Sequence, residues 1–274
     1  MSHNHQKKVA VVNDFCGFGR CSLAVSLPII SALKLQCCPL PTSIFSNHTG
    51  FSSFHSTDYT EHMDAYIDEW VKLGLHFDGI LTGYLASSAQ IEIVTRFLKQ
   101  FGHDKNITVI DPVMGDGGRL YTSYSEQLSK RMTRLVEYAD VLTPNLTEAC
   151  ILTGKEYRED ISDGALLDIA KELLSYGPRG VVISGLERKG ELLNLVVDSS
   201  ERVDIIGTER VGKCRSGTGD VFSSIITADL VLGRDLSDAV GHAAEFIGRV
   251  MKRSVELDLP LTDGVAFEEY LTEI

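Results

Sequence analysis

The stretch VGKCRSGTGD at residues 211–220 holds the side chains and glycines most able to do chemistry. Gly217 and Gly219 flank Thr218 directly before VFSSIITADLVL, an apolar segment typical of a helix. Backbone N–H groups at a helix start, together with the helix dipole, bind anions such as phosphate. Asp220 in the first turn could accept a proton from an attacking hydroxyl group. On this stretch alone, an ordinary helix start in which the dipole favours Asp220 fits equally well.

A second interpretation begins at Gly207, where GTERVGKC matches G-x-x-x-x-G-K-[ST] except at its last position. That position carries a hydroxyl that ligates Mg²⁺, and a thiol at Cys214 suits Mg²⁺ poorly. The lysine is also followed by another glycine turn instead of a helix. A dinucleotide site after the first strand fails similarly, because Ser22 replaces the third glycine of the fingerprint.

Acidic and amide residues follow two other predicted strands. Asp111 ends a strand in IDPVMGDGG, with Asp116 in the glycine-rich loop after it, and TPNLTEA places Asn145 at a strand end and Glu148 one helical turn later. Oxygen ligands of this kind suit Mg²⁺, which usually keeps several waters. A phosphate site, magnesium-suited acids and a base together indicate phosphoryl transfer to an alcohol.

The elements that must position these residues alternate between strands and helices. Buried strands are predicted at 8–14, 77–83, 107–113, 139–145 and 180–185, an irregular or edge strand at 37–46, and a hairpin or two adjacent strands at 191–198 and 201–207. Helices are predicted at 23–35, 60–74, 87–102, 126–139, 147–154, 165–177, 220–233 and 236–255. This order predicts parallel strands with helices on both faces and a ligand site at the carboxyl ends of the strands.

Composition narrows the class of protein further. The chain has 274 residues, 43% of them hydrophobic, and shows no linker, so we expect one domain over residues 1–274. A net charge of −12 without a basic stripe argues against nucleic acid as a partner. No signal core or long apolar run is present, and none of the six cysteines forms a C-x-x-C pair. We therefore expect a cytoplasmic protein with no membrane partner and no zinc site.

Five motifs in order carry a family resemblance: FSNHTGF at 45–51, LTGYLAS at 81–87, DPVMGD, TPNLTEA and GTGD. Together they resemble the vitamin-kinase branch of the ribokinase-like superfamily, and within it the pyridoxal kinases. The resemblance implies a three-layer α/β/α fold with a mostly parallel central sheet, and a homodimer. It also implies phosphorylation of the 5′-hydroxymethyl group of pyridoxal, pyridoxine or pyridoxamine in vitamin B6 salvage, with ATP and Mg²⁺. The resemblance leaves open a monovalent cation as a further cofactor.

The resemblance also assigns roles to residues of this chain. Asp220 becomes the general base, and the amides of Gly217, Thr218 and Gly219 become an anion hole. The nucleotide and phosphate residues would be Asp111, Thr143, Asn145, Glu148, Ser184, Gly185, Lys213, Arg215, Ser216, Gly217 and Thr218, with Asp111 and Glu148 in the metal region. The substrate ring would contact Asp14, Thr49 and Tyr84 beside Asp220. Lys213 and Arg215 would stabilise phosphate charge, or else form a solvated loop face.

The first strand departs from the family pattern. Pyridoxal kinases commonly carry Gln-Ser-His there, whereas this chain has Asn13-Asp14-Phe15, and aspartate near this place is reminiscent of hydroxymethylpyrimidine kinases. A carboxylate could pair with a protonated ring nitrogen or accept from an amino or hydroxyl substituent. A thiamine-pathway or dual-specificity kinase therefore stays open, as do a sugar kinase and a non-catalytic protein that binds a nucleotide or vitamer.

Overall fold

The computed structural model of the chain describes residues 5–103, 105–121 and 124–274. The larger of two sheets within these ranges has its strands in the order β11-β10-β9-β8-β5-β4-β1-β2-β3. Its strands are β1 (Lys8–Cys16), β2 (Gln36–Phe45), β3 (Ser56–Asp58), β4 (Gly79–Thr82), β5 (Ile107–Ile110), β8 (Val141–Leu142), β9 (Gly180–Arg188), β10 (Glu191–Asp198) and β11 (Val203–Glu209). β6 (Gly115–Asp116) and β7 (Arg119–Leu120) form a separate small hairpin.

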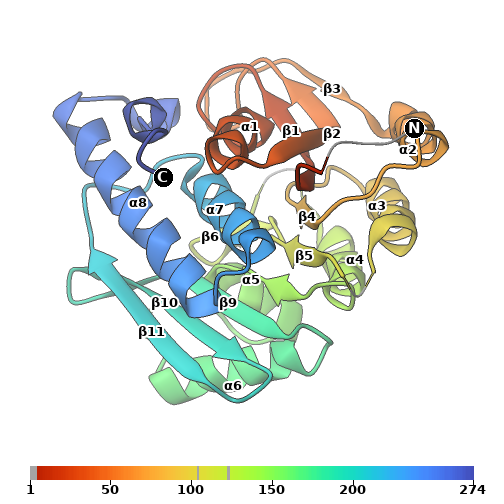
Figure 1. The fold of residues 1–274 in the computed structure, drawn as a ribbon. Coiled ribbons are helices and arrows are strands. Elements are labelled where there is room, and N and C mark those ends of the chain that lie inside the picture. Colours follow the sequence, from red (N-terminus) through yellow and green to blue (C-terminus); the bar gives the residue numbers. More distant parts are fainter. Residues whose placement is uncertain (1–4, 104, 122–123) are drawn as a thin grey trace.

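Helices cover both faces of the large sheet, as Figure 1 shows. They are α1 (Leu23–Ala32), α2 (Thr60–Lys72), α3 (Ser88–Phe101), α4 (Glu126–Val136), α5 (Leu146–Thr153), α6 (Asp163–Leu174), α7 (Thr218–Leu232) and α8 (Leu236–Glu256). Two short 3-10 turns, Leu261–Asp263 and Glu268–Tyr270, follow near the carboxyl terminus. In the part of the chain that the structure describes, no helix combines the length and apolarity needed to cross a bilayer.

Alternating side chains of the strands build two separate cores. Val9 and Val11 of β1 pack with α1, α7 and α8, whereas Ala10 and Val12 pack with α2 to α6. Successive side chains of a strand point to opposite faces, so an almost continuous apolar run is what a strand covered on both sides requires. The predicted three-layer α/β/α fold is thereby confirmed.

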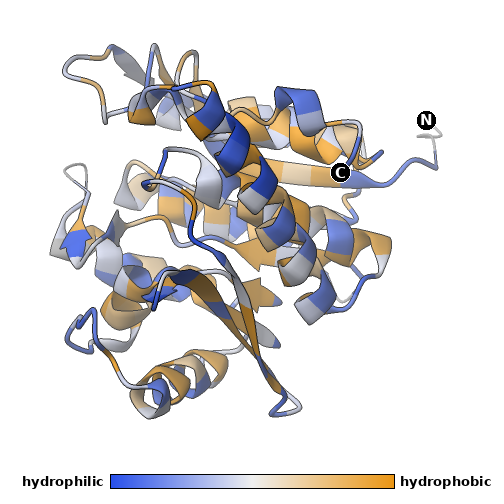
Figure 2. Cartoon of the chain, turned by 90° about the vertical axis from the view of Figure 1, so that its left-hand side faces the viewer, coloured by the Kyte–Doolittle hydropathy of each residue, from blue (hydrophilic) through white to orange (hydrophobic). Residues whose placement is uncertain are grey.

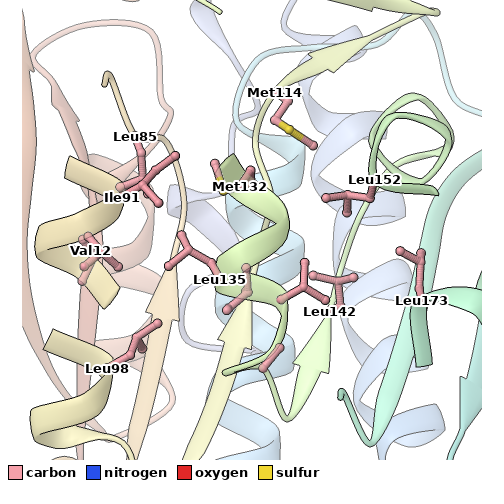
Figure 3. Packing of buried hydrophobic residues seen from close by; sticks show 14 of the residues in the cluster. Val12, Leu85, Ile91, Leu98, Met114, Met132, Leu135, Leu142, Leu152 and Leu173 are labelled. Carbon is pink, nitrogen blue, oxygen red and sulfur yellow. The ribbon is translucent and has the colours of Figure 1, made fainter. Parts of the chain in front are cut away.

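The second of these cores is visible in close-up. Figure 3 shows Leu98 of α3, Met132 of α4 and Leu173 of α6 among the side chains that pack with Val12 and Leu142 of the strands. In Figure 2 the strands are mostly hydrophobic, whereas the helices carry both hydrophobic and hydrophilic residues. The two cores pack the helices against the two faces of the sheet.

The parallel strands all end at one edge of the sheet. β1 pairs in parallel with β2 and β4, β4 with β5, β5 with β8, and β8 with β9. β9, β10 and β11 are successive antiparallel neighbours, which confirms the hairpin expected at 191–207. The carboxyl ends of these strands therefore converge, with Asp14 near the end of β1 and Tyr84, Asp111 and Asn145 directly after β4, β5 and β8.

Several element boundaries differ from the prediction. The strand expected at 139–145 is limited to Val141–Leu142, because the next residues enter the cap of α5. β3 and the β6–β7 hairpin were not predicted, since each is only two or three residues long. β2 is irregular as expected but lies one strand in from the edge, and β3 pairs with it only at Ser43–Phe45.

Candidate active site

Asp220 lies in the first turn of α7, where two donors from the first strand region hold its carboxylate. Asn13 donates from Nδ2 to Asp220 Oδ1 at 3.0 Å, and the backbone N–H of Ser22 donates to the same carboxylate. Burial raises the pKa of Asp220 to about 6 and the nearby Asp14 adds to this, whereas the two hydrogen bonds lower it. A carboxyl group with a pKa near neutral is suited to general-base work.

The turn before α7 requires glycine. Gly217 has φ +80°, and a Cβ built on it would lie 1.9 Å from the carbonyl oxygen of Arg20. Thr218 reinforces the turn, because its hydroxyl donates to the carbonyl of Arg215 at 3.1 Å. The N–H groups of the first helical residues have no acceptor within the helix itself, so they are available to an anion.

Asp111 and Glu148 lie close enough to each other to interact, and Asp111 also interacts with Asp220. Burial raises the pKa of Asp111 well above its ordinary value, and the negative charges of Glu148 and Asp220 raise it further, against a hydrogen bond from Ser223. Burial raises the pKa of Glu148 to about 8. Carboxylates that repel one another in this way are suited to a cation between them.

Glu148 also accepts hydrogen bonds from two segments of the backbone. Its Oε2 accepts from the N–H of Asn145 at 2.8 Å and its Oε1 from the N–H of Met114 at 3.0 Å. Asn145 in turn caps α5 and accepts from the N–H of Glu148 at 3.0 Å, which completes a capping box. Glu148 therefore orders the start of α5 and the loop after β5 together.

Asp111 and Glu148 can supply only part of the ligands that Mg²⁺ requires. Among the described residues, no group of three or more His, Cys, Asp or Glu side chains forms a metal-binding set. Mg²⁺ is usually bound through one or two carboxylates together with phosphate oxygens and waters. Asp111 and Glu148 fit that arrangement.

The residues expected along the nucleotide come from neighbouring strand ends. Asn145 and Ser184 form an isolated parallel bridge, and Ser184 N–H donates to the carbonyl of Pro144 at 3.0 Å. Gly185 follows with φ +71° and is exposed. Thr143 is 4% exposed, and its hydroxyl lies 3.5 Å from the carbonyl oxygen of Ile110.

Two basic residues of the loop before α7, Lys213 and Arg215, have different environments. Lys213 is exposed, and Ser216 is partly exposed between Arg215 and the glycine turn. Arg215 is only 7% exposed, and its Nη1 donates to the carbonyl of Pro260 at 2.9 Å, while its Nε finds no partner among the described residues. Neither the expected cationic pair nor the alternative of a solvated loop face describes both residues.

Asp14 is buried and already engaged. It is 5% exposed, its Oδ1 accepts from the hydroxyl of Ser22 at 2.7 Å, and its Oδ2 accepts from the thiol of Cys16 at 3.3 Å. Burial raises the pKa of Asp14, and these hydrogen bonds oppose the increase. The expected ring contact would have to share these oxygens with both donors, since each carboxylate oxygen can accept two hydrogen bonds.

Aromatic residues gather beside this carboxylate. Tyr84 is partly buried, and its backbone N–H donates to Asn13 Oδ1 at 2.8 Å. His48 and Phe51 have ring centroids 4.7 Å apart, and Thr49 between them is exposed. Flat aromatic side chains of this kind are suited to contact with a heteroaromatic ring.

Ser22 is the most unusual residue of the site. Its backbone has φ 58° and ψ −139°, a conformation that residues with side chains rarely adopt. Such a backbone costs of the order of 1–3 kcal/mol and persists only where surrounding contacts hold it. Here it directs the backbone N–H of Ser22 toward Asp220 and its hydroxyl toward Asp14.

Carbonyl groups near the carboxyl terminus hold three basic side chains of the site. Arg215 donates to Pro260, Arg20 donates from Nη1 to Asp263 at 3.0 Å, and His48 donates from Nε2 to Thr262 at 2.7 Å. We refer to residues 260–268 as the C-terminal strap. It joins the loop before α7, the loop after β1 and the loop after β2.

Sequence reasoning missed Asn13, Ser22 and the strap as site components. Asn13 was noticeable as a polar residue near the end of a buried strand, but its contact with Asp220 spans 207 residues. Ser22 was noted only because it breaks a glycine fingerprint. No local pattern signals the strap, since its backbone carbonyls make the contacts.

Comparison with known proteins places this geometry in context. The phosphomethylpyrimidine kinase family model matches residues 27–261. Among similar proteins, the pyridoxine kinase of Bacillus subtilis (strain 168) is 32% identical over 187 residues, which cover 68% of each chain. The hydroxymethylpyrimidine/phosphomethylpyrimidine kinase of Aquifex aeolicus (strain VF5) is 31% identical over 183 residues, covering 65% of this chain and 69% of its own.

A solved structure agrees over nearly the full length. It is that of a Bacteroides thetaiotaomicron protein provisionally described as a phosphomethylpyrimidine kinase, in a crystal form with pyridoxal. The two chains are 37% identical, the match covers 98% of this chain and 95% of the other, and the TM-score is 0.94.

Proposed function

Because this chain belongs to the phosphomethylpyrimidine kinase family, a family of phosphotransferases that act on hydroxyl groups, we propose that it phosphorylates B6 vitamers. The substrates would be pyridoxal, pyridoxine and pyridoxamine, the donor ATP, and the product the 5′-phosphate. The observation that carries this proposal is the position of Asp220, which lies beside the glycine turn with its carboxylate held by Asn13 and a pKa of about 6. The relatives with pyridoxine or pyridoxal in their names support the choice of ring.

The reaction is an in-line transfer to the hydroxymethyl oxygen. Asp220 accepts the hydroxyl proton as that oxygen attacks the γ-phosphorus, and ADP leaves with the bridging oxygen. The amides of Gly217, Thr218 and Gly219 donate to the charged oxygens of the transferring group. Asn13 and the Ser22 N–H keep the carboxylate of Asp220 directed at the hydroxyl.

Asp111 and Glu148 are the residues that would hold Mg²⁺, together with phosphate oxygens. The bound ion would supply positive charge at the transferring phosphoryl group. Thr143, Asn145, Ser184 and Gly185 would line the path of the nucleotide. Lys213 and Ser216 would cover its phosphates, and Arg215, whose Nη1 donates to Pro260, would join them through its remaining N–H groups.

A thiamine-pathway kinase is the second candidate. The family model carries the name phosphomethylpyrimidine kinase, and the Aquifex aeolicus relative is named for hydroxymethylpyrimidine and its phosphate. Both substrate types are flat heteroaromatic rings with a hydroxymethyl group, so the aromatic walls around Tyr84 and Phe51 would accept either. We give preference to the B6 vitamers because of FSNHTGF and the pyridoxal in the similar crystal structure.

We further propose that residues 1–274 act as one kinase domain and that two copies form a homodimer, as the family resemblance implies. An intact Asp220 and glycine turn argue against a non-catalytic binding protein. Phe15, Phe18 and Phe51 near the site argue against a sugar substrate, whose recognition relies on polar contacts.

A substrate panel tests the proposed function. Purified protein with ATP and Mg²⁺ is offered pyridoxal, pyridoxine, pyridoxamine, hydroxymethylpyrimidine and ribose, and ADP formation is coupled to a spectroscopic readout. The highest kcat/KM should belong to a B6 vitamer. A preference for hydroxymethylpyrimidine would favour the second candidate, and turnover of ribose alone would contradict both.

A further inference from the structure

We infer that Asp14 is a positioning residue that acts through Ser22 on Asp220, and not a ligand of the substrate ring. The inference rests on the proposed function, because it takes Asp220 as the base of the reaction. It gives Asp14 a different role from the contact with the substrate ring that the departure of the first strand from the family pattern suggests. The reasons are the backbone of Ser22, the direction of its hydroxyl and the occupied oxygens of Asp14.

Four hydrogen bonds close a ring of residues around the base. Asn13 donates from Nδ2 to Asp220 Oδ1 at 3.0 Å, and the Ser22 N–H donates to the same carboxylate. The hydroxyl of Ser22 donates to Asp14 Oδ1 at 2.7 Å, and the N–H of Asp14 donates to Asn13 Oδ1 at 2.9 Å. Asp14 therefore touches both residues that hold Asp220.

The hydroxyl of Ser22 is used in an unusual way. A serine at the N-cap of a helix ordinarily accepts a hydrogen bond from a backbone N–H one turn later. Ser22 occupies that position of α1, yet its side chain makes no cap hydrogen bond and donates to Asp14 instead. The contact with Asp14 thus takes the place of the cap and, together with the bridge between Ser22 and Phe15, holds the backbone at φ 58°. Without the contact to Asp14, the Ser22 N–H would be held less firmly toward Asp220.

Direct recognition of the ring by Asp14 is less consistent with the geometry. Both carboxylate oxygens already accept hydrogen bonds, one from Ser22 and one from Cys16, and the residue is 5% exposed. Each oxygen could accept one further hydrogen bond, but at 5% exposure a ring donor would reach Asp14 only if its neighbours moved, and moving Ser22 would release the residue that holds the base. Substrate binding and base positioning would then oppose each other.

Three variants and one control test the inference. Asp14→Ala removes the acceptor, Asp14→Asn keeps an amide oxygen that can accept from Ser22, and Ser22→Ala removes the hydroxyl. Asp78→Ala is the control, because that carboxylate accepts from the N–H of Lys8 at the opposite end of β1. Steady-state kinetics with the best vitamer give kcat and KM separately, and thermal unfolding shows which variants are folded.

A positioning role predicts a loss in kcat with little change in KM. Asp14→Ala should lose about 10²-fold in kcat, the effect expected of a misplaced catalytic group. Asp14→Asn should recover most of that loss, and Asp14→Ala combined with Ser22→Ala should lose no more than either single variant. Asp78→Ala should keep the kcat of the original protein.

Other outcomes overturn the inference in distinguishable ways. If Asp14→Asn is as impaired as Asp14→Ala and the loss is in KM, the carboxylate binds the substrate ring. If Asp14→Ala cannot be folded, full activity in Ser22→Ala still contradicts the inference. If the original protein phosphorylates none of the vitamers or hydroxymethylpyrimidine, the proposed function fails, and the inference fails with it.

Discussion

The environment of Asp220 explains how an aspartate can act as a base near neutral pH. An ordinary aspartate is a weak base, whereas burial and the charge of Asp14 give this one a pKa of about 6. Asn13 and the Ser22 N–H moderate the shift, so that the ionised form is still the main species at pH 7. Carboxylate geometry and basicity are thereby set by the same contacts.

The pH dependence of kcat/KM follows from this pKa. Below about pH 6 the base is increasingly protonated, and protonated Asp220 cannot accept the hydroxyl proton. We expect kcat/KM to fall about tenfold for each pH unit below that value. Rates measured from about pH 4.5 to about pH 8 with saturating nucleotide would show this fall in kcat/KM at acid pH. A flat profile down to roughly pH 5 would contradict a base with a raised pKa.

Local sequence predicted the base and its turn but not the residues that hold them. GTGD next to an apolar helix can be recognised because anion binding at a helix start depends on adjacent residues. Asn13 and Ser22 could not be recognised, since their contacts with Asp220 exist only after strands and helices have packed. The positive φ of Ser22 has no signature in the residue type.

At the scale of elements, α7 is positioned by a close contact between two backbones. Its N-cap, Gly217, lies against the carbonyl of Arg20, and no side chain fits between them. The contact sets the distance from the anion-binding amides to the loop after β1, which carries Ser22. A shift of the Gly217 turn would therefore also change the position of Asp220.

Gly217→Ala tests this contact. The new Cβ would lie 1.9 Å from the Arg20 carbonyl oxygen at a φ of +80°, so the turn must shift. We expect a loss of stability greater than about 1 kcal/mol, together with a fall in kcat. Gly219→Ala is the matched control, because its Cβ meets no atom within 4 Å. Chemical denaturation would measure the free energy of unfolding of both variants. Equal stability of Gly217→Ala and Gly219→Ala would contradict the account.

Most elements could be predicted from periodicity, and the exceptions have physical reasons. The helix predicted at 87–102 and the helix after GTGD are found as expected, because their signals are local. β8 is shorter than predicted because the capping box of α5 takes over directly after it. β3 depends on pairing with β2, which a three-residue segment does not reveal by itself.

At the scale of the whole molecule, the C-terminal strap connects distant parts of the site. It is held to α8 by Ser254, whose Oγ accepts from the N–H of Ala266 at 2.8 Å and donates to Val250 at 2.6 Å. Directly after the strap, Glu269 forms an ion pair with Arg253 of α8. The last residues of the chain thus support loops that come from its first fifty.

Ser254→Ala should loosen the strap. The buried N–H of Ala266 would lose its acceptor, which costs about 1–3 kcal/mol of unfolding free energy. We also expect a higher KM for the vitamer, because His48 and Arg20 would be held less firmly. Leu98→Ala in α3 provides a comparison, since it should cost about 2–5 kcal/mol without touching the strap. An unchanged KM in Ser254→Ala would show that the strap does not support the site.

The order of strands and helices therefore predicted the layers and the edge at which the site lies. It did not predict that Arg215 would be directed at Pro260, or that Asp14 would be directed at Ser22. Those orientations depend on which loops pack together. Residue types name the chemistry that is possible, whereas packing decides which groups are available for it.

The most direct test of the central claim is turnover of pyridoxal and ATP by the original protein and by Asp220→Asn. We predict pyridoxal 5′-phosphate from the original protein, and a kcat lower by about 10²–10⁴-fold in the variant with nucleotide binding retained. The variant should also be at least as stable to heat, because the raised pKa means that the fold penalises the charged form. Near-normal turnover in Asp220→Asn would contradict the account.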